Sequence, residues 1–187
     1  YAPSIYSHDC YTRDSIIYSA EIYSGNLSIY DAHDPQNITM LGQVRTPSEF
    51  THNAWLSANS KYMFTTDERP DSYVASYDIT DPGNIIELDR WRQAATEGLG
   101  NVVHNVYVWE QDWLLVAYYA NGTVIVDGSR PDNLVEVGNF DSFQGPDGYY
   151  PGVWGTYPWL PSGKVLSSDR NSGLYVFEPN YVRACFL

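Results

Sequence analysis

The chain has 187 residues, 43% hydrophobic and 16% aromatic. Disordered proteins avoid this composition, because large rings supply the burial that offsets ordering entropy. Its 10 basic and 23 acidic residues give a formal charge of −13, which disfavours nucleic acid and anionic membrane surfaces as partners and favours cations. No apolar run approaches the roughly 20 residues that cross a bilayer, so we expect no direct membrane span.

Three short apolar runs open the chain, at residues 8–11, 16–21 and 27–31. Runs of this length, bounded by turn-forming residues, predict β-strands. The same three runs return at 52–55, 62–67 and 74–78, at 104–107, 114–119 and 123–127, and at 154–157, 165–169 and 174–177. The first residue of each copy, here called the lead residue, is His8, His52, His104 or Trp154.

A repeated turn follows each of the first three copies, with the pattern Asp-x-x-Asp/Arg-Pro-x-Asn at 31–37, 78–84 and 127–133. Proline fixes φ for a turn, and Asp and Asn close it with side-chain hydrogen bonds. A fourth run then follows at 38–44, 85–91 and 134–140. We also expect Gly25, Gly122 and Gly173 to occupy tight turns before the third strands.

Four strands per repeat of about 50 residues predict an all-β fold, a β-propeller of four-stranded antiparallel blades. We expect one propeller region over 1–187, with blades at about 1–45, 46–97, 98–145 and 146–187. A solenoid is the alternative, but its repeats are usually shorter. The last blade lacks a clear fourth strand, which suits either closure by both termini or membership of a larger ring.

Several strings stand in a recognisable order: SHDC at 7–10, THNAWL at 51–56, TDE at 66–68, HNVY at 104–107, TVIVD at 123–127, WGTYP at 154–158 and SDRNSGLYVF at 168–177. This order resembles that of the secreted choice-of-anchor B proteins with LVIVD-type repeats. The resemblance implies a β-propeller exported to the cell surface or beyond, with no assigned reaction. Members of that family carry further repeats, so a protein partner or missing repeats are expected to complete the ring.

Equivalent positions of a propeller blade converge on the central channel, which makes the lead residues His8, His52 and His104 candidate ligands for a transition metal. A second repeated position holds Glu21, Asp67, Tyr118 and Asp169, and Glu68 follows Asp67. The three acidic members are candidate ligands for calcium or another divalent cation. Hydrogen bonding between strands is the structural alternative for all six side chains.

No GxSxG elbow, HExxH motif, phosphate-binding loop or DxDxDG calcium loop is present. We therefore expect no catalytic residues of those types and favour a non-enzymatic extracellular binding or scaffolding module, with possible roles in a surface assembly. The alternative is a metal-dependent secreted enzyme with a His and carboxylate site in the channel. The aromatic segment 140–159 is compatible with stacking on glycans, with a protein partner, or with packing between blades.

Three sequons place Asn26, Asn37 and Asn121 at expected turns, as candidate glycosylation sites. Cys10 and Cys185 lie near opposite ends of the chain and do not form a CxxC motif. A disulfide between them, two separate thiols, and pairing with other chain segments all remain open at this point.

Overall fold

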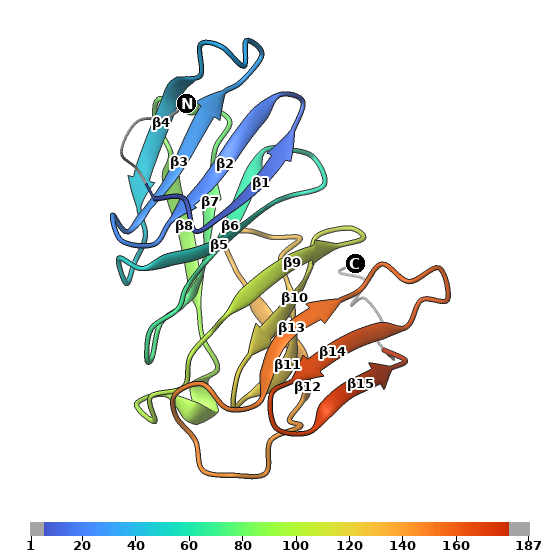
Figure 1. Ribbon diagram of the computed structural model, residues 1–187. Helices are drawn as coiled ribbons and strands as arrows, with labels where there is room; N and C mark the ends of the chain where they lie inside the picture. Colours follow the sequence, from blue (N-terminus) through green and yellow to red (C-terminus); the bar gives the residue numbers. More distant parts are fainter. Residues whose placement is uncertain (1–5, 180–187) are drawn as a thin grey trace.

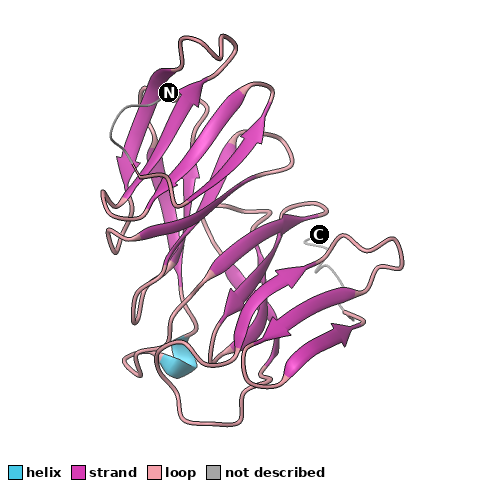
Figure 2. Ribbon diagram, in the orientation of Figure 1, coloured by secondary structure: helices cyan, strands magenta, loops and turns pink. Residues whose placement is uncertain are grey.

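The structure is a computed structural model that describes residues 6–179. Fifteen strands form four antiparallel sheets, and each sheet uses strands that are consecutive in the chain. Figure 2 shows strands throughout, with one short 3-10 helix, η1 (Ala94–Thr96). Within the described part of the chain, no helix has the length and apolarity to cross a membrane.

Each sheet falls within one of the expected blades. The first contains β1 (Asp9–Arg13), β2 (Ile16–Glu21), β3 (Asn26–Asp31) and β4 (Thr39–Arg45). The second contains β5 (Thr51–Leu56), β6 (Tyr62–Asp67), β7 (Val74–Asp78) and β8 (Ile86–Trp91). The third contains β9 (Asn105–Trp109), β10 (Trp113–Tyr118), β11 (Gly122–Asp127) and β12 (Val135–Phe140). The fourth contains β13 (Val153–Tyr157), β14 (Val165–Asp169) and β15 (Gly173–Phe177).

The turns have the chemistry that the sequence predicts. Gly25, Gly122 and Gly173 have φ values of 69°, 84° and 92°, a region that glycine adopts without steric cost. In the repeated turn, the carboxylates of Asp31 and Asp78 accept hydrogen bonds from the backbone two residues later, at 2.8 and 2.9 Å. These local bonds bring each fourth strand back against the third strand of its sheet.

Two apolar clusters hold neighbouring sheets together. One joins the first and second sheets and contains Leu27, Leu56 and Met63. The other joins the second and third sheets and contains Phe64 and Val116. The middle strands of these three sheets are largely buried, whereas the outer strands β4, β8 and β12 are more exposed. The blade faces therefore supply the core, as stacking of repeats requires.

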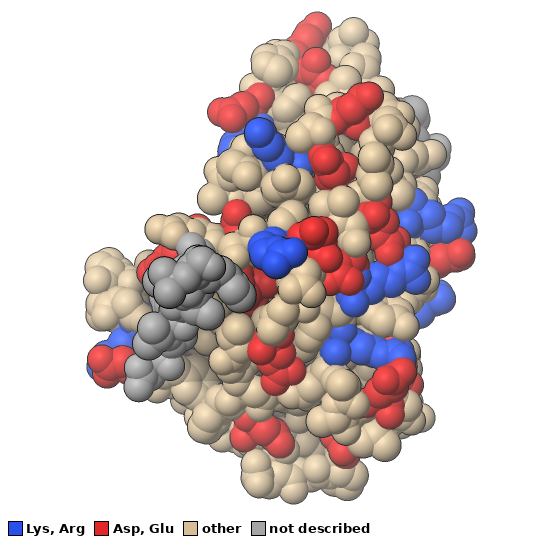
Figure 3. Space-filling model, turned by 180° about the vertical axis from the view of Figure 1, so that it is seen from behind, with Lys and Arg blue, Asp and Glu red and all other residues tan. Residues whose placement is uncertain are grey.

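The four sheets follow one another along an arc. Contacts join β2 to β5, β5 to β9 and β10 to β13, and Figure 1 shows the first and last sheets at opposite ends. Among the described residues, β15 pairs only with β14, which confirms that the last blade lacks a fourth strand there. Acidic side chains are spread from end to end over the rear face (Figure 3), as the net charge predicts.

Candidate metal centre

The lead residues lie where the first strand of each sheet begins, and two of them, His52 and Trp154, lie at bulges. The pairing of β5 with β6 skips His52, and the pairing of β13 with β14 skips Trp154. The backbone N–H of His8 donates to the carbonyl of Ala20, which is paired with Asp9. In the same way, the N–H of His104 donates to the carbonyl of Ala117, which is paired with Asn105. An extra residue on one strand re-aims side chains, so the bulges direct the lead residues and their neighbours to one place.

The three lead histidines form a row across three blades. The ring centroids of His8 and His52 are 4.2 Å apart, and those of His52 and His104 are 4.3 Å apart. Trp154 continues the row, with its ring 5.2 Å from that of His104. The convergence that the repeat predicts is therefore present for the histidines.

Glu68 is the acidic residue that joins this row. Its Oε2 lies 3.4 Å from His52 Nε2, and its Oε1 lies 3.8 Å from His104 Nε2. One ligand atom from each of the three side chains lies within 4.8 Å of the other two, so His52, Glu68 and His104 could bind a metal ion. His8 lies beside the group but is not part of it.

Hydrogen bonds leave the relevant ring nitrogens available. His104 Nδ1 donates to the carbonyl of Trp154, which places the proton there and leaves a lone pair on Nε2. His8 Nδ1 likewise donates to the carbonyl of His52, at 3.1 Å. His52 Nδ1 is buried and has no hydrogen-bond partner among the described residues.

Burial keeps both metal-facing imidazoles neutral. It lowers the pKa of His104 to about 3, with help from the neighbouring His52. Burial also lowers the pKa of His52, although the Glu68 carboxylate opposes that change. Neutral imidazole is the form that binds metals, so these rings are ready to act as ligands at neutral pH.

Tyr119 fixes the carboxylate of Glu68. Its hydroxyl donates to Glu68 Oε1 at 2.7 Å, and its ring lies 5.0 Å from that of His104. Burial first, and then the bond to Glu68, raise the pKa of Tyr119, so this hydroxyl keeps its proton. The residue also has a φ of 23°, a strained value for a non-glycine residue of the kind that clusters at functional sites.

An open hollow of about 530 Å³ lies over the group. Its lining residues are His8, Asp9, His52, Asn53, Trp55, Glu68, His104, Asn105, Tyr107 and Trp154. The residues that follow the lead histidines form a polar layer in which Asn53 Nδ2 donates to Asp9 Oδ2 at 2.8 Å. We call this space the channel hollow. It gives a small molecule a route to the candidate metal ligands.

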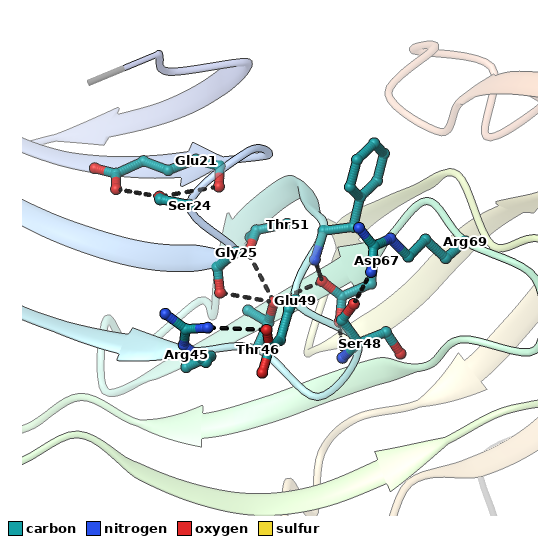
Figure 4. Close-up of polar contacts among 11 residues, drawn as sticks. Glu21, Ser24, Gly25, Arg45, Thr46, Ser48, Glu49, Thr51, Asp67 and Arg69 are labelled. Carbon is teal, nitrogen blue, oxygen red and sulfur yellow. Dashed lines mark hydrogen bonds and ion pairs between the residues drawn. The ribbon is translucent and has the colours of Figure 1, made fainter. Parts of the chain in front are cut away.

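Two of the other acidic candidates, Glu21 and Asp67, lie in separate hydrogen-bond networks (Figure 4). Asp67 accepts bonds from Thr46 Oγ1 at 2.5 Å and from the backbone N–H groups of Ser48 and Phe50 at 2.8 and 3.0 Å. Glu21 accepts a bond from Ser24 Oγ at 2.9 Å. Burial raises the pKa of Asp67, and these donors partly offset the change.

Asp169 also lies in a hydrogen-bond network of its own. Its carboxylate accepts bonds from Ser142 Oγ at 2.6 Å and from the backbone N–H of Asn171 at 2.7 Å. The expected layer of Glu21, Asp67 and Asp169 is therefore not brought together, and these three match the structural alternative. Successive side chains of a strand point to opposite faces, and the bulges shift that alternation at the strand ends. Glu68, one residue after Asp67, is the acid that reaches the histidines.

The three sequons differ in accessibility. Asn37 is exposed and Asn26 is half-buried. Asn121 is only 4% exposed, and its amide donates to Thr96 Oγ1 at 2.7 Å and to the side chain of Gln93. A glycan on Asn121 would break these bonds, so the structure argues against that candidate. Cys10 is exposed, whereas Cys185 lies outside the described residues, so their pairing stays untested.

No protein-family model and no curated protein matches the sequence. Solved structures do match. The periplasmic gluconolactonase of Pseudomonas aeruginosa aligns with a TM-score of 0.70 at 16% identity, over 92% of this chain and 50% of that one. A structural-genomics protein from Lactobacillus plantarum aligns with a TM-score of 0.75 at 13% identity, again over 92% and 50%.

A third structure, a Bacteroides fragilis protein provisionally assigned as a 6-phosphogluconolactonase, aligns with a TM-score of 0.63 at 15% identity over 77% and 41%. The chain has the fold of half a β-propeller. It spans about half the length of the solved structures it matches, and the identities are low enough that the likeness concerns the fold alone. The resemblance to LVIVD-repeat proteins stays a prediction.

Proposed function

We propose that this chain is part of a β-propeller binding module that holds a divalent transition metal ion in its channel and binds its ligand there. The observation that carries the proposal is the group His52, Glu68 and His104, whose ligand atoms lie within 4.8 Å of one another beneath the channel hollow. Two buried imidazoles and a carboxylate in this arrangement are costly to assemble without a compensating partner.

The ligand set favours zinc or ferrous iron over calcium. Imidazole nitrogen suits zinc, iron and copper, and two histidines with one carboxylate are a common set for zinc and for ferrous iron. Calcium prefers six to eight oxygen ligands, and the described group offers one carboxylate. The separate networks of Asp67 and Asp169 keep their carboxylates from adding to that number.

A metal-dependent enzyme is the second candidate, and one observation favours it. Three protein ligands would leave at least one coordination position of a bound ion free, and the same three residues line the channel hollow. Catalytic zinc sites have this form, whereas structural zinc sites use four protein ligands. One matched structure is a gluconolactonase, so lactones are the first substrates to screen.

Elemental analysis of the purified protein tests the proposal. We expect about one zinc or iron ion per chain in the wild type and in the control His33→Ala, because His33 is exposed in a turn and pairs only with Asp31. We expect loss of the ion in His52→Ala and His104→Ala, with the far-ultraviolet β signal retained. Equal metal content in all four proteins, or none in the wild type, contradicts the proposal.

The same samples separate the two candidates. Lactone hydrolysis that stops when a chelator removes the ion, and returns with zinc or ferrous iron, identifies an enzyme. Metal binding without turnover identifies a binding module. The expected location outside the cell is likewise a proposal, supported by the exposed Asn37 sequon and the acidic composition.

A further inference from the structure

Besides the candidate metal ligands, the channel hollow is lined by aromatic side chains and by polar side chains. Trp55, Tyr107 and Trp154 supply aromatic rings, while Asp9 and the two asparagines of the polar layer supply planar hydrogen-bonding groups. Trp154 is 54% exposed although it is among the largest apolar side chains. A few polar groups converging beside aromatic walls are typical of small-molecule sites, and about 530 Å³ lies within their usual range of roughly 300–1,000 Å³.

The charge of the channel hollow selects against charged ligands. Its described lining contains the carboxyl groups of Asp9 and Glu68 and no Lys or Arg, so phosphate and carboxylate groups are repelled. A divalent ion on the candidate ligands would offset both carboxylates, and its own charge must be counted. The loaded site is then close to neutral, so its net charge favours neither an anion nor an organic cation over a neutral ligand.

We infer that the channel hollow takes a neutral saccharide, which lies against Trp154 and turns an oxygen toward the metal ion. This inference rests on the proposed metal site. The face of an aromatic ring carries partial negative charge, and it attracts the polarised C–H groups of a sugar ring. Asn53 is buried with both amide atoms paired, to Asp9 and Val106, so Asp9 and Asn105 are the groups that can exchange hydrogen bonds with sugar hydroxyls.

A further exposed ring packs against one of the lining residues, Trp55. Trp159 stacks on Trp55 with 18° between the ring planes and centroids 5.1 Å apart, and it remains 37% exposed. Tyr157, which is also exposed, meets Trp159 edge to face at 5.2 Å. A ligand with two sugar rings could therefore contact Trp154 with one ring and the exposed rings of Trp159 and Tyr157 with the other.

Calorimetric titration of the zinc-loaded 187-residue chain tests the inference. The probes are cellobiose and methyl β-D-glucopyranoside as neutral saccharides, gluconate and glucose 6-phosphate as anions, and choline as a cation. We expect the neutral saccharides to bind and the charged probes to bind more weakly. Trp154→Ala should raise the dissociation constant for cellobiose about tenfold. The matched control is Tyr23→Ala, which removes a 77% exposed ring outside the hollow.

Tighter binding of gluconate, glucose 6-phosphate or choline than of cellobiose overturns the inference, and so does unchanged cellobiose binding in Trp154→Ala. Zinc binding without saccharide binding overturns this inference and leaves the metal site standing. Saccharide binding to a chain that takes up no zinc does the reverse: it removes the metal site and keeps the aromatic wall as the recognition surface.

Discussion

Tyr119 links the two kinds of ligand at the candidate metal centre. It donates to Glu68 Oε1 and packs against His104, so it holds the carboxylate in one orientation with Oε2 toward His52. Groups that orient metal ligands typically change metal affinity by about 10- to 100-fold when they are removed. The orientation of Glu68 in the candidate metal centre therefore depends on a residue outside the group of candidate ligands.

We therefore expect Tyr119→Phe to weaken zinc binding by about tenfold while the fold is retained, because the ring stays and only the hydroxyl is lost. Competition with a fluorescent zinc chelator measures the change. Tyr23→Phe, on an exposed side chain, is the control. Equal zinc affinity in Tyr119→Phe and wild type would show that Glu68 needs no such support.

The buried histidines also predict how stability depends on pH. The folded-state pKa of His104, about 3, lies below the usual value of 6.5, so the unfolded chain binds more protons between these values. The stabilisation is fully present above pH 6.5 and is lost as pH falls toward 3. For the metal-free protein, the free energy of unfolding should fall by up to about 1.4 kcal/mol per pH unit for each such histidine.

Urea unfolding of the metal-free protein between pH 7.5 and 5 measures this slope. His104→Gln should flatten it, and His33→Gln should leave it unchanged. The raised pKa of Asp67 acts in the opposite direction, but Asp67 is present in all three proteins, so their difference isolates His104. A slope that is the same in all three would mean that His104 does not stay neutral in the folded chain.

At the scale of the strand, the turn before β11 limits what position 122 can hold. Gly122 has a φ of 84°, and a Cβ added there would lie 2.1 Å from the carbonyl oxygen of Phe140. Gly163 has a φ of 73° but faces open space. The two glycines share the backbone requirement and differ in the close contact.

Gly163→Ala should cost about 1 kcal/mol in the free energy of unfolding, for its backbone conformation alone. Gly122→Ala should cost at least about 2 kcal/mol, because β12 must also move away from β11. Chemical denaturation of both variants gives the comparison. Equal costs would mean that the close approach of Phe140 relaxes without penalty.

The repeat explains how much of the strands and site the sequence could predict. The fourth strands begin within one residue of the runs expected at 38, 85 and 134, because turn chemistry and apolar runs are local. His52 and His104 were found because they repeat. Glu68 was not, since the residues after Glu21, Tyr118 and Asp169 are Ile22, Tyr119 and Arg170, which share no metal-binding chemistry.

The side to which the repeated acids turn could not be predicted. It depends on how the loops between blades pack: the carboxylate of Asp67, for example, accepts hydrogen bonds from Thr46 and Ser48, in the loop that joins β4 to β5. Tyr119 was missed for a similar reason, because its contact with Glu68 joins two blades and is set by how they pack.

At the scale of the molecule, the residues that the structure describes leave apolar side chains of the last sheet exposed. Leu174 and Val176 on β15 are 65% and 57% exposed, and Phe140 of the preceding sheet is also exposed. An apolar strand with an unpaired edge favours association. The further blades or partner that the half-length match suggests would cover this face.

We therefore expect the isolated chain to sediment as more than a 21.2 kDa monomer at micromolar concentration. Val176→Lys should shift the chain toward the monomer, because charge on an edge strand opposes pairing. The matched control is Leu41→Lys, which makes the same kind of change at an exposed apolar residue of β4, at the other end of the arc. A monodisperse wild-type monomer would show that β15 needs no cover.

X-ray absorption at the zinc edge of the loaded 187-residue chain tests most directly whether His52 and His104 hold a metal ion in the channel. The structure predicts a first shell of nitrogen and oxygen at about 2.0–2.1 Å, with the outer-ring scattering of two imidazoles. That imidazole signal should disappear in the His52→Ala, His104→Ala double variant. A sulfur shell at about 2.3 Å, or the same spectrum in the double variant, would contradict the claim.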